Sequence, residues 1–220
     1  MSADARPTRA PLTCVVVVIF TVRDNHPEVL LITRSADPER GLWALPGGLL
    51  LDGEGLDMAA ARKLVEEAGV RDVYLEQLYS FDDLDPSAPE GSVAVSYFAL
   101  VDASMVRLAP RDEWQAAWYP TNELPEVAFA NDRVVEYALE RLRNKLQYSN
   151  VVYSLMPEEF GLGRLQKVYE SILDQTFDKR NFRKRILSLG IVEETGDVRA
   201  EGAHRPARIY RFIRREPTTF

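Results

Sequence analysis

The fold is decided by the segment Gly48–Val70, GLLLDGEGLDMAAARKLVEEAGV. Its second half has an apolar residue at every fourth position, namely Leu56, Ala60, Leu64 and Ala68. That spacing predicts a short amphipathic helix over 56–68, and Gly69 stands where a helix usually ends. The glycine-rich stretch Leu45–Gly48 before it indicates a bend that leaves a short strand.

The same segment resembles the Nudix signature, which reads G, five residues, E, seven residues, then R-E-U-x-E-E-x-G-U, where U is a bulky aliphatic residue. Eight of the nine defined positions match. The matching residues are Gly48, Glu54, Arg62, Leu64, Glu66, Glu67, Gly69 and Val70. This resemblance implies a Nudix-type α/β/α sandwich with a pocket for a nucleotide that contains a pyrophosphate.

Lys63 occupies the mismatched position, where the resemblance implies a glutamate. In Nudix hydrolases this glutamate and those matching Glu66 and Glu67 hold Mg²⁺, because a hard cation prefers oxygen ligands. A lysine changes the charge of the three side chains from about −3 to about −1, and Lys63 can pair with Glu67 four residues later. We therefore predict no catalytic residues, weak metal binding by Glu66 and Glu67 at most, no required cofactor, and lost or very weak hydrolysis.

Two other interpretations stay open at this point. Lys63 could be a solvated surface residue while a carboxylate elsewhere, such as Glu113, completes the magnesium site. The chain would then be an active ADP-ribose pyrophosphatase with an accessory tail. The third interpretation is a protein-binding adaptor, for which the sequence indicates no particular groove.

A Nudix pocket without turnover can still bind a nucleotide, since binding and hydrolysis are separable. Aromatic residues that could stack on an adenine are Phe20, Trp43 and Phe81, and Arg34 could bind a phosphate or a ribose hydroxyl. Glu54 and Arg62 of the signature complete the predicted ligand site. Core packing explains Phe20 and Trp43 equally well, and Arg34 could be a surface charge at a strand end.

Strand patterns surround the signature. They cover Leu12–Val22, Glu28–Arg34, Val73–Phe81, Ser92–Val101 and a region within Arg111–Leu124. The first two flank Arg23–Pro27, which has the composition of a hairpin turn. Asn131 and Asp132 can cap a helix that runs to about Leu146. We expect a flexible arm over residues 1–11 and a Nudix-like domain over 12–148.

Length and composition agree with a soluble protein of two domains. The chain has 220 residues, and the net charge of −7 is unevenly distributed. Residues 150–220 contain 13 Lys and Arg against 10 Asp and Glu, while the remainder contains 14 against 24. The single cysteine, Cys14, begins an apolar run to Phe20 that is too short to cross a bilayer. These features predict a cytoplasmic protein with no membrane contact.

The basic tail has the pattern of a winged helix-turn-helix domain over 149–220. Leu162–Leu173 and Asp178–Leu189 have apolar residues at helical spacing, and Ile191–Glu194 with Ala207–Ile213 predicts a hairpin. The fold class is therefore α+β, with a Nudix-type α/β/α sandwich followed by this domain. The predicted DNA contacts of the second helix are Lys179, Arg180, Asn181, Arg183 and Lys184, and those of the wing are Arg199, His204, Arg205 and Arg208. Arginine and asparagine can read base edges, whereas lysine binds phosphates.

With this tail, nearly the whole chain resembles the Nudix-related transcriptional regulators of NAD metabolism. The specific stretches are Phe160–Glu170, Asp178–Arg183 and Arg205–Phe212. The resemblance implies a homodimeric repressor of NAD biosynthesis or salvage genes that binds double-stranded operator DNA. It also implies release by ADP-ribose or a related nucleotide effector. Two places depart from the pattern, because Asp85–Glu90 lacks the expected arginines and Ala130-Asn131 replaces an acid–histidine pair.

Overall fold

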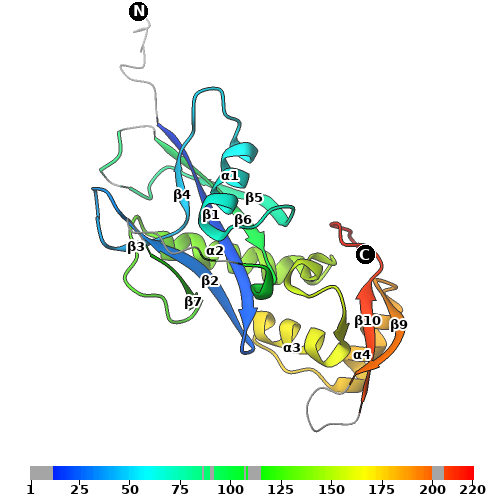
Figure 1. Cartoon of the computed structure of the whole chain (residues 1–220). Helices are drawn as coiled ribbons and strands as arrows, with labels where there is room; N and C mark the ends of the chain where they lie inside the picture. The colour runs from blue at the N-terminus through cyan, green and yellow to red at the C-terminus, as the bar shows by residue number, and fades with distance from the viewer. Residues whose placement is uncertain (1–11, 86, 90–91, 107, 109–114, 200–205) are drawn as a thin grey trace, which may run out of the picture.

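The computed structural model describes residues 12–85, 87–89, 92–106, 108, 115–199 and 206–220. The N-terminal part is a seven-stranded mixed sheet between two helices, and the C-terminal part is a small sheet beside two further helices (Figure 1). This architecture confirms the predicted fold class, a Nudix-type sandwich followed by a winged helix-turn-helix. The predicted arm over residues 1–11 lies outside the described residues.

The large sheet is organised around β1 (Thr13–Arg23), which runs parallel to β6 (Val93–Leu100). Its other strands pair antiparallel, in the order β3-β2-β1-β6-β5, with β4 added to β1 and β7 added to β2. These strands are β2 (His26–Thr33), β3 (Trp43–Ala44), β4 (Gly47–Leu49), β5 (Tyr74–Phe81) and β7 (Ala116–Pro120). A short 3₁₀ helix, η1 (Ala103–Met105), follows β6.

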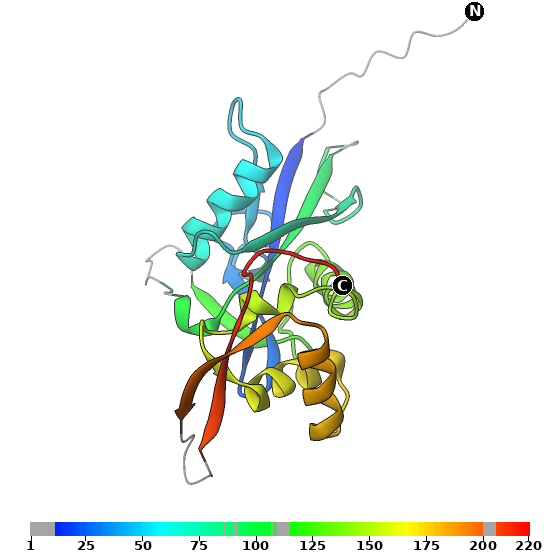
Figure 2. The same cartoon turned by 90° about the vertical axis from the view of Figure 1, so that its right-hand side faces the viewer.

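The helices α1 (Leu56–Ala68) and α2 (Asn131–Lys145) cover opposite faces of the large sheet (Figure 2). Alternate residues of β1 belong to two different apolar clusters. Val15 and Val17 pack in the cluster that contains α1, while Val18 and Phe20 pack in the cluster that contains α2. Because both faces of β1 are covered, its sequence is a continuous apolar run.

The signature segment folds as predicted. The helix α1 has the expected bounds, and Gly69 ends it in the left-handed conformation with φ 68°. Gly47 is required for a different reason, since a Cβ there would lie 2.6 Å from the carbonyl oxygen of Val15. Glycine therefore allows β4 to approach β1 and brings the start of the signature against the sheet.

The β1–β2 turn is shorter than predicted. Instead of Arg23–Pro27, it consists of Asp24 and Asn25 alone, with φ 48° and 64°, and Arg23 pairs with His26. Two residues with positive φ form the turn whose twist matches a hairpin, and Asp and Asn tolerate this conformation. His26 and Pro27 consequently belong to β2.

Asn131 does not cap α2, contrary to the prediction. The cap position is Ala130, in a left-handed conformation, and it provides no side-chain hydrogen bond. The Asn131 Oδ1 instead accepts a hydrogen bond from the backbone N–H of Leu45 at 2.7 Å. This long-range bond fixes the start of α2 against the bend that precedes β4.

The C-terminal part begins with a 3₁₀ helix, η2 (Val151–Leu155), and a two-residue strand, β8 (Phe160–Gly161). The helices α3 (Leu162–Leu173) and α4 (Lys179–Ser188) follow, then β9 (Val192–Arg199) and β10 (Ala207–Phe212). The small sheet has the order β8-β10-β9. The strand β9 extends beyond the predicted Ile191–Glu194, because Arg199 pairs with Ala207. No helix in the described ranges is long and apolar enough to cross a membrane.

One cluster of buried apolar side chains continues from the α2 face of the large sheet into the C-terminal part. It includes Leu142 of α2, Val152 of η2, Leu165 of α3 and Phe182 of α4. Near its edge, the Arg143 guanidinium of α2 donates a hydrogen bond to the carbonyl oxygen of Ile172 in α3, at 2.8 Å. The two parts therefore share a packed interior as well as a connecting segment.

Asn150 anchors the C-terminal segment to the junction between the two parts. Its side chain is 2% exposed. The Oδ1 accepts from the backbone N–H of Thr218 at 2.7 Å, and the Nδ2 donates to the carbonyl oxygen of Glu216 at 3.0 Å. Alanine would remove both hydrogen bonds and leave Asn150's buried position unfilled by a polar group, while the backbone groups of Glu216 and Thr218 lie at exposed residues that water can reach.

We expect Asn150→Ala to lower the free energy of unfolding by about 1–3 kcal/mol, since two hydrogen bonds are lost and each contributes about 0.5–1.5 kcal/mol. Urea denaturation followed by circular dichroism measures this change. Asn144→Ala, at an exposed position on α2, is the matched control and should stay within about 0.5 kcal/mol of the parent. Equal stability of the two variants would show that Asn150 is not an anchor.

Candidate functional site

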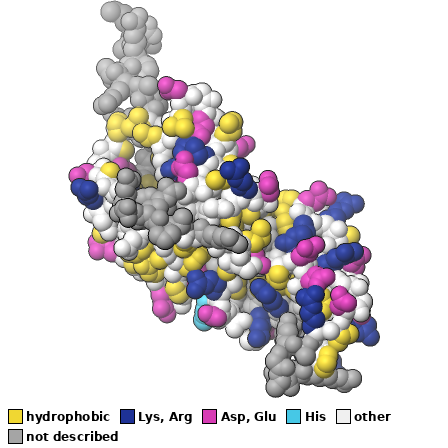
Figure 3. Space-filling model, viewed as in Figure 1, with side chains coloured by type: hydrophobic (Ala, Val, Ile, Leu, Met, Phe, Trp, Pro, Cys, Tyr) yellow, Lys and Arg dark blue, Asp and Glu magenta, His cyan; other side chains and the backbone are white. Residues whose placement is uncertain are grey.

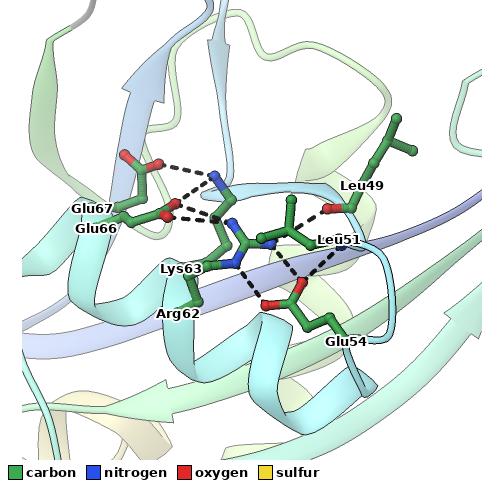
Figure 4. Close-up of polar contacts among 7 residues, drawn as sticks. All are labelled: Leu49, Leu51, Glu54, Arg62, Lys63, Glu66 and Glu67. Atoms are coloured by element: carbon green, nitrogen blue, oxygen red, sulfur yellow. Dashed lines mark hydrogen bonds and ion pairs between the residues drawn. The ribbon is translucent and has the colours of Figure 1, made fainter.

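Lys63 lies among the carboxylates of α1 (Figure 4). Its Nζ is 2.9 Å from Oε2 of Glu66 and 3.5 Å from Oε1 of Glu67, so the predicted pairing with Glu67 is present. The Lys63 side chain is only 15% exposed and that of Glu67 only 7%. Burial raises the pKa of Glu66, but hydrogen bonds and positive charge from Lys63 and Arg62 outweigh burial and lower it.

Arg62 connects the loop before α1 to the helix. Its Nε and Nη2 donate to the two carboxylate oxygens of Glu54, at 2.7 and 2.8 Å, and its Nη1 lies 3.3 Å from Glu66. Glu54 in turn accepts from the backbone N–H of Leu51 at 3.0 Å. The hydrogen bonds from Arg62 and Leu51 lower the pKa of Glu54 to about 2. Glu54 and Arg62 of the signature thus hold the loop against α1.

The residues present do not fit a magnesium ion at the position that the signature implies. Such an ion needs oxygen ligands, whereas the Lys63 ammonium group stands within 3.5 Å of both Glu66 and Glu67. Within the described ranges, no three His, Cys, Asp or Glu side chains form a group that could hold a metal. Glu113, the alternative ligand considered above, lies outside those ranges.

A cavity of about 570 Å³ opens beside this cluster. Its lining includes Lys63 and Glu67 of α1, Gly48 of β4, and two predicted ligand contacts, Arg34 and Phe81. The Arg34 guanidinium donates to the carbonyl oxygens of Pro38 and Ala36, at 2.9 and 3.2 Å. It also lies 4.2 Å from the centre of the Phe129 ring. Arg34 therefore has a defined position at the cavity wall, while its contact with a ligand stays a prediction.

Four other predicted ligand contacts lie elsewhere. Phe20 is 1% exposed in the core of the sheet, so its ring is not available for stacking, which corrects that prediction. Trp43 packs edge-on against Tyr119, with ring centres 5.0 Å apart, and does not line the cavity. Glu54 and Arg62 also lie outside the cavity lining, because they bind each other at the base of the loop.

Sequence reasoning missed several residues of the cavity wall. Asn131 and Phe129 line it from the start of α2, and Asp82 and Asp85 line it from the loop after β5. These segments contain the two departures from the family pattern, around Asp85–Glu90 and at Ala130-Asn131. The departures were therefore the available signal that both segments belong to the pocket.

The helix α4 presents a basic surface on a fixed frame. The Asp178 carboxylate caps the helix by accepting from the backbone N–H groups of Arg180 and Asn181, at 3.1 and 2.9 Å. Phe182 and Ile186 are buried as predicted. The exposed residues include the predicted contacts Lys179, Arg180, Asn181 and Lys184. This face has the chemistry required to enter a major groove.

The arginines near the small sheet are bound to other side chains. Arg183, predicted to contact bases, donates to the Tyr210 hydroxyl of β10 at 2.7 Å. Arg208 pairs with Glu194 at 2.9 Å, and Arg199 pairs with Glu159. Contact of Arg199 or Arg208 with a phosphate would require each to exchange its ion-pair partner, whereas Arg183 is exposed and bound only to a neutral hydroxyl. The remaining wing candidates, His204 and Arg205, lie outside the described residues.

Comparison with known proteins relates both parts of the chain to characterised domains. Residues 12–138 match the NUDIX domain family, and residues 152–212 match the NrtR DNA-binding winged helix domain. The ADPR responsive transcriptional repressor NtrR of Acinetobacter baylyi is 36% identical over 207 residues, which cover 92% of this chain and 82% of that protein.

Solved structures give the same result. The Shewanella oneidensis NrtR complexed with a 27mer DNA superposes with a TM-score of 0.81 at 33% identity, covering 91% of this chain and 93% of that one. The NUDIX domain of the same protein complexed with ADP ribose has a TM-score of 0.54 at 34% identity, covering 64% of this chain and 95% of that domain. The similarity thus includes both the pocket and the basic helix.

Proposed function

Since this chain belongs to the family of Nudix proteins that carry an NrtR DNA-binding winged helix, we propose that it is a transcriptional repressor whose Nudix domain senses a nucleotide. One observation carries the proposal. A single chain combines a pocket whose expected metal ligands surround an ammonium group with an exposed, capped basic helix. The pocket suits binding of a nucleotide without turnover, and the basic helix suits binding of duplex DNA.

The proposed effector is ADP-ribose or a related nucleotide. The cavity of about 570 Å³ offers Arg34 for a phosphate or a hydroxyl, and the largely buried Phe81 contributes apolar surface to its wall. Both contacts are inferred from the position of these side chains at the wall. The effector named for the relatives from Acinetobacter baylyi and Shewanella oneidensis agrees with this choice.

The proposed activity excludes efficient hydrolysis. Neither magnesium nor another cofactor is required in this proposal, because Lys63 takes the place of an oxygen ligand and neutralises part of the carboxylate charge. In the proposed complex with the nucleotide, Glu66 and Glu67 keep the Lys63 ammonium group in place through ion pairs. An active pyrophosphatase is less favoured, since it would need a further carboxylate to displace this ammonium group.

The helix α2 offers a physical connection between the pocket and the DNA-binding part. Asn131 at its start lines the cavity, and Arg143 near its end is bonded to α3. A ligand that shifts the start of α2 would therefore act on α3, and through α3 on α4. We further propose a homodimer whose two copies of α4 read half-sites about 34 Å apart, with genes of NAD synthesis or salvage as targets.

We expect ADP-ribose to weaken binding of the full chain to a preferred duplex by about 5- to 150-fold, the range typical of coupling between two sites. The duplex is selected from a random library with the unmodified protein, and affinity is measured by fluorescence anisotropy. Arg34→Ala should bind the duplex normally but need more ADP-ribose for release. Arg40→Ala, an exposed change outside the cavity lining, is the matched control.

The result that would overturn the proposal is a selected duplex whose affinity is the same with and without saturating ADP-ribose. Ribose 5-phosphate serves as a ligand control, because it lacks the adenine and the pyrophosphate. If it released DNA as effectively as ADP-ribose, the pocket would not distinguish the proposed nucleotide class.

A further inference from the structure

A large basic groove lies where the Nudix domain meets the winged helix. Its volume is about 960 Å³, and its walls come from α3, α4, β10 and the β1–β2 turn. Five cationic side chains line it: Arg164, Lys167, Lys179, Arg183 and Arg208. Figure 1 shows the turn beside α3, and Figure 3 shows Lys and Arg side chains interspersed with Asp and Glu over this half of the molecule.

The cations without an ion-pair partner lie on the helices rather than on the wing. Among the described residues, no acidic side chain is within ion-pair distance of Arg164, Lys167 or Lys179, whereas Arg208 pairs with Glu194 at 2.9 Å. All three unpaired cations are exposed. An anion can therefore bind them without first breaking an ion pair.

The Nudix domain supplies the opposite wall through Asp24 and Asn25. Asn25 also lines a smaller cavity along α3 together with Lys167, so the turn rests against that helix. Asp24 is the single acidic side chain among the described lining residues of the groove. The turn residues have positive φ, which fixes the backbone of this wall.

We propose that the phosphate backbone of duplex DNA crosses this groove, bound by Arg164 and Lys167, with the Asp24–Asn25 turn of the Nudix domain as part of the DNA-binding surface. This inference rests on the proposed function, because it takes duplex DNA as the partner. Lys179 belongs both to the groove and to the first turn of α4. A duplex that receives α4 in its major groove therefore has its flanking phosphates at Arg164 and Lys167.

The turn gives the Nudix domain a direct influence on DNA affinity. Strand β2 runs from the turn at His26 to Thr33, and both Thr33 and Arg34 line the nucleotide cavity. The Asp24 carboxylate repels the phosphates of DNA. A shift of Asp24 toward or away from the cations of the groove therefore changes how strongly the groove attracts DNA. Nucleotide binding at one end of the β1–β2 hairpin can thus change DNA affinity at the other end.

The test uses the full chain and a labelled duplex of about 30 base pairs with random sequence, because phosphate contacts do not depend on sequence. Arg164→Ala combined with Lys167→Ala should weaken binding about 10- to 100-fold near 0.1 M salt and reduce the salt slope of log K by about 2. Arg71→Ala, at an exposed position outside the groove, is the control for a lost cation.

Asp24→Asn tests the wall itself, since asparagine suits the same turn and removes the negative charge. Affinity should rise about two- to fivefold at low salt and return to the parent value at high salt, where screening is strong. Asp52→Asn, in the exposed loop before α1, is the matched control and should change nothing. Melting temperatures of all variants verify that they fold.

The outcomes separate the inference from the proposed function. If the double variant and Asp24→Asn bind like the parent, while Arg180→Ala weakens binding to a selected duplex, the groove is not a DNA surface but the repressor assignment stands. If the parent chain itself binds no duplex at low salt, both fail.

Discussion

Lys63→Glu should convert the chain into a magnesium-dependent hydrolase, with turnover of ADP-ribose about a hundredfold or more above that of the parent. The substitution removes the ammonium group that lies 2.9 Å from Glu66 and completes a set of three carboxylates. A bound divalent cation contributes several kcal/mol to stabilising charge in a transition state, and each 1.4 kcal/mol corresponds to about tenfold in rate. Product formation is followed by chromatography over a magnesium titration.

Two further variants make this prediction specific. Lys63→Gln removes the positive charge without adding an oxygen anion, so it should stay close to the parent in activity. Glu67→Gln added to Lys63→Glu should abolish most of the gain, because one ligand is lost again. Rapid turnover by the unmodified chain would refute the interpretation of Lys63 as the residue that disables the site.

Arg180→Ala and Asn181→Ala should each weaken binding to the selected duplex by about 5- to 150-fold, while binding to random duplex changes much less. Both side chains are exposed on the capped first turn of α4. A paired hydrogen bond to a base edge discriminates by about 1–3 kcal/mol, and random DNA is held mainly by its phosphates. Anisotropy titrations on the two duplexes measure the difference.

Lys184→Ala provides the comparison for these two variants. Lysine is expected to contact phosphate, so its loss should weaken both duplexes by a similar factor. If Arg180→Ala and Asn181→Ala show that same uniform loss, they bind the backbone, and base reading must come from other residues.

The elements that the sequence predicted accurately are those with a local and periodic cause. The bounds of α1 and α3 follow from apolar residues at helical spacing, and both agree with the structure. The strand β8 has only two residues and exists because Gly161 pairs with Ile209, which is distant in the sequence. No local pattern indicates such a pairing, and the same is true of the extension of β9.

In the candidate site, too, local features were predictable from the sequence and features set by tertiary packing were not. The pairing of Lys63 with Glu67 follows from helical geometry alone and was predictable. The exclusion of Phe20 and Trp43 from the pocket depends on which face of the sheet each ring occupies and on what covers it. Arg183 stays a predicted DNA contact, and its hydrogen bond to Tyr210, made between α4 and β10, is one that no spacing rule contains.

The buried cluster that runs from α2 into α3 and α4 has a thermodynamic consequence. Leu142 and Leu165 belong to a common interior, so the sandwich cannot unfold without exposing apolar surface of the DNA-reading half. We therefore expect the two halves to denature cooperatively. A nucleotide that binds only the folded sandwich stabilises the entire polypeptide by mass action, and the heat resistance of α4 depends on the occupancy of a cavity that α4 does not line.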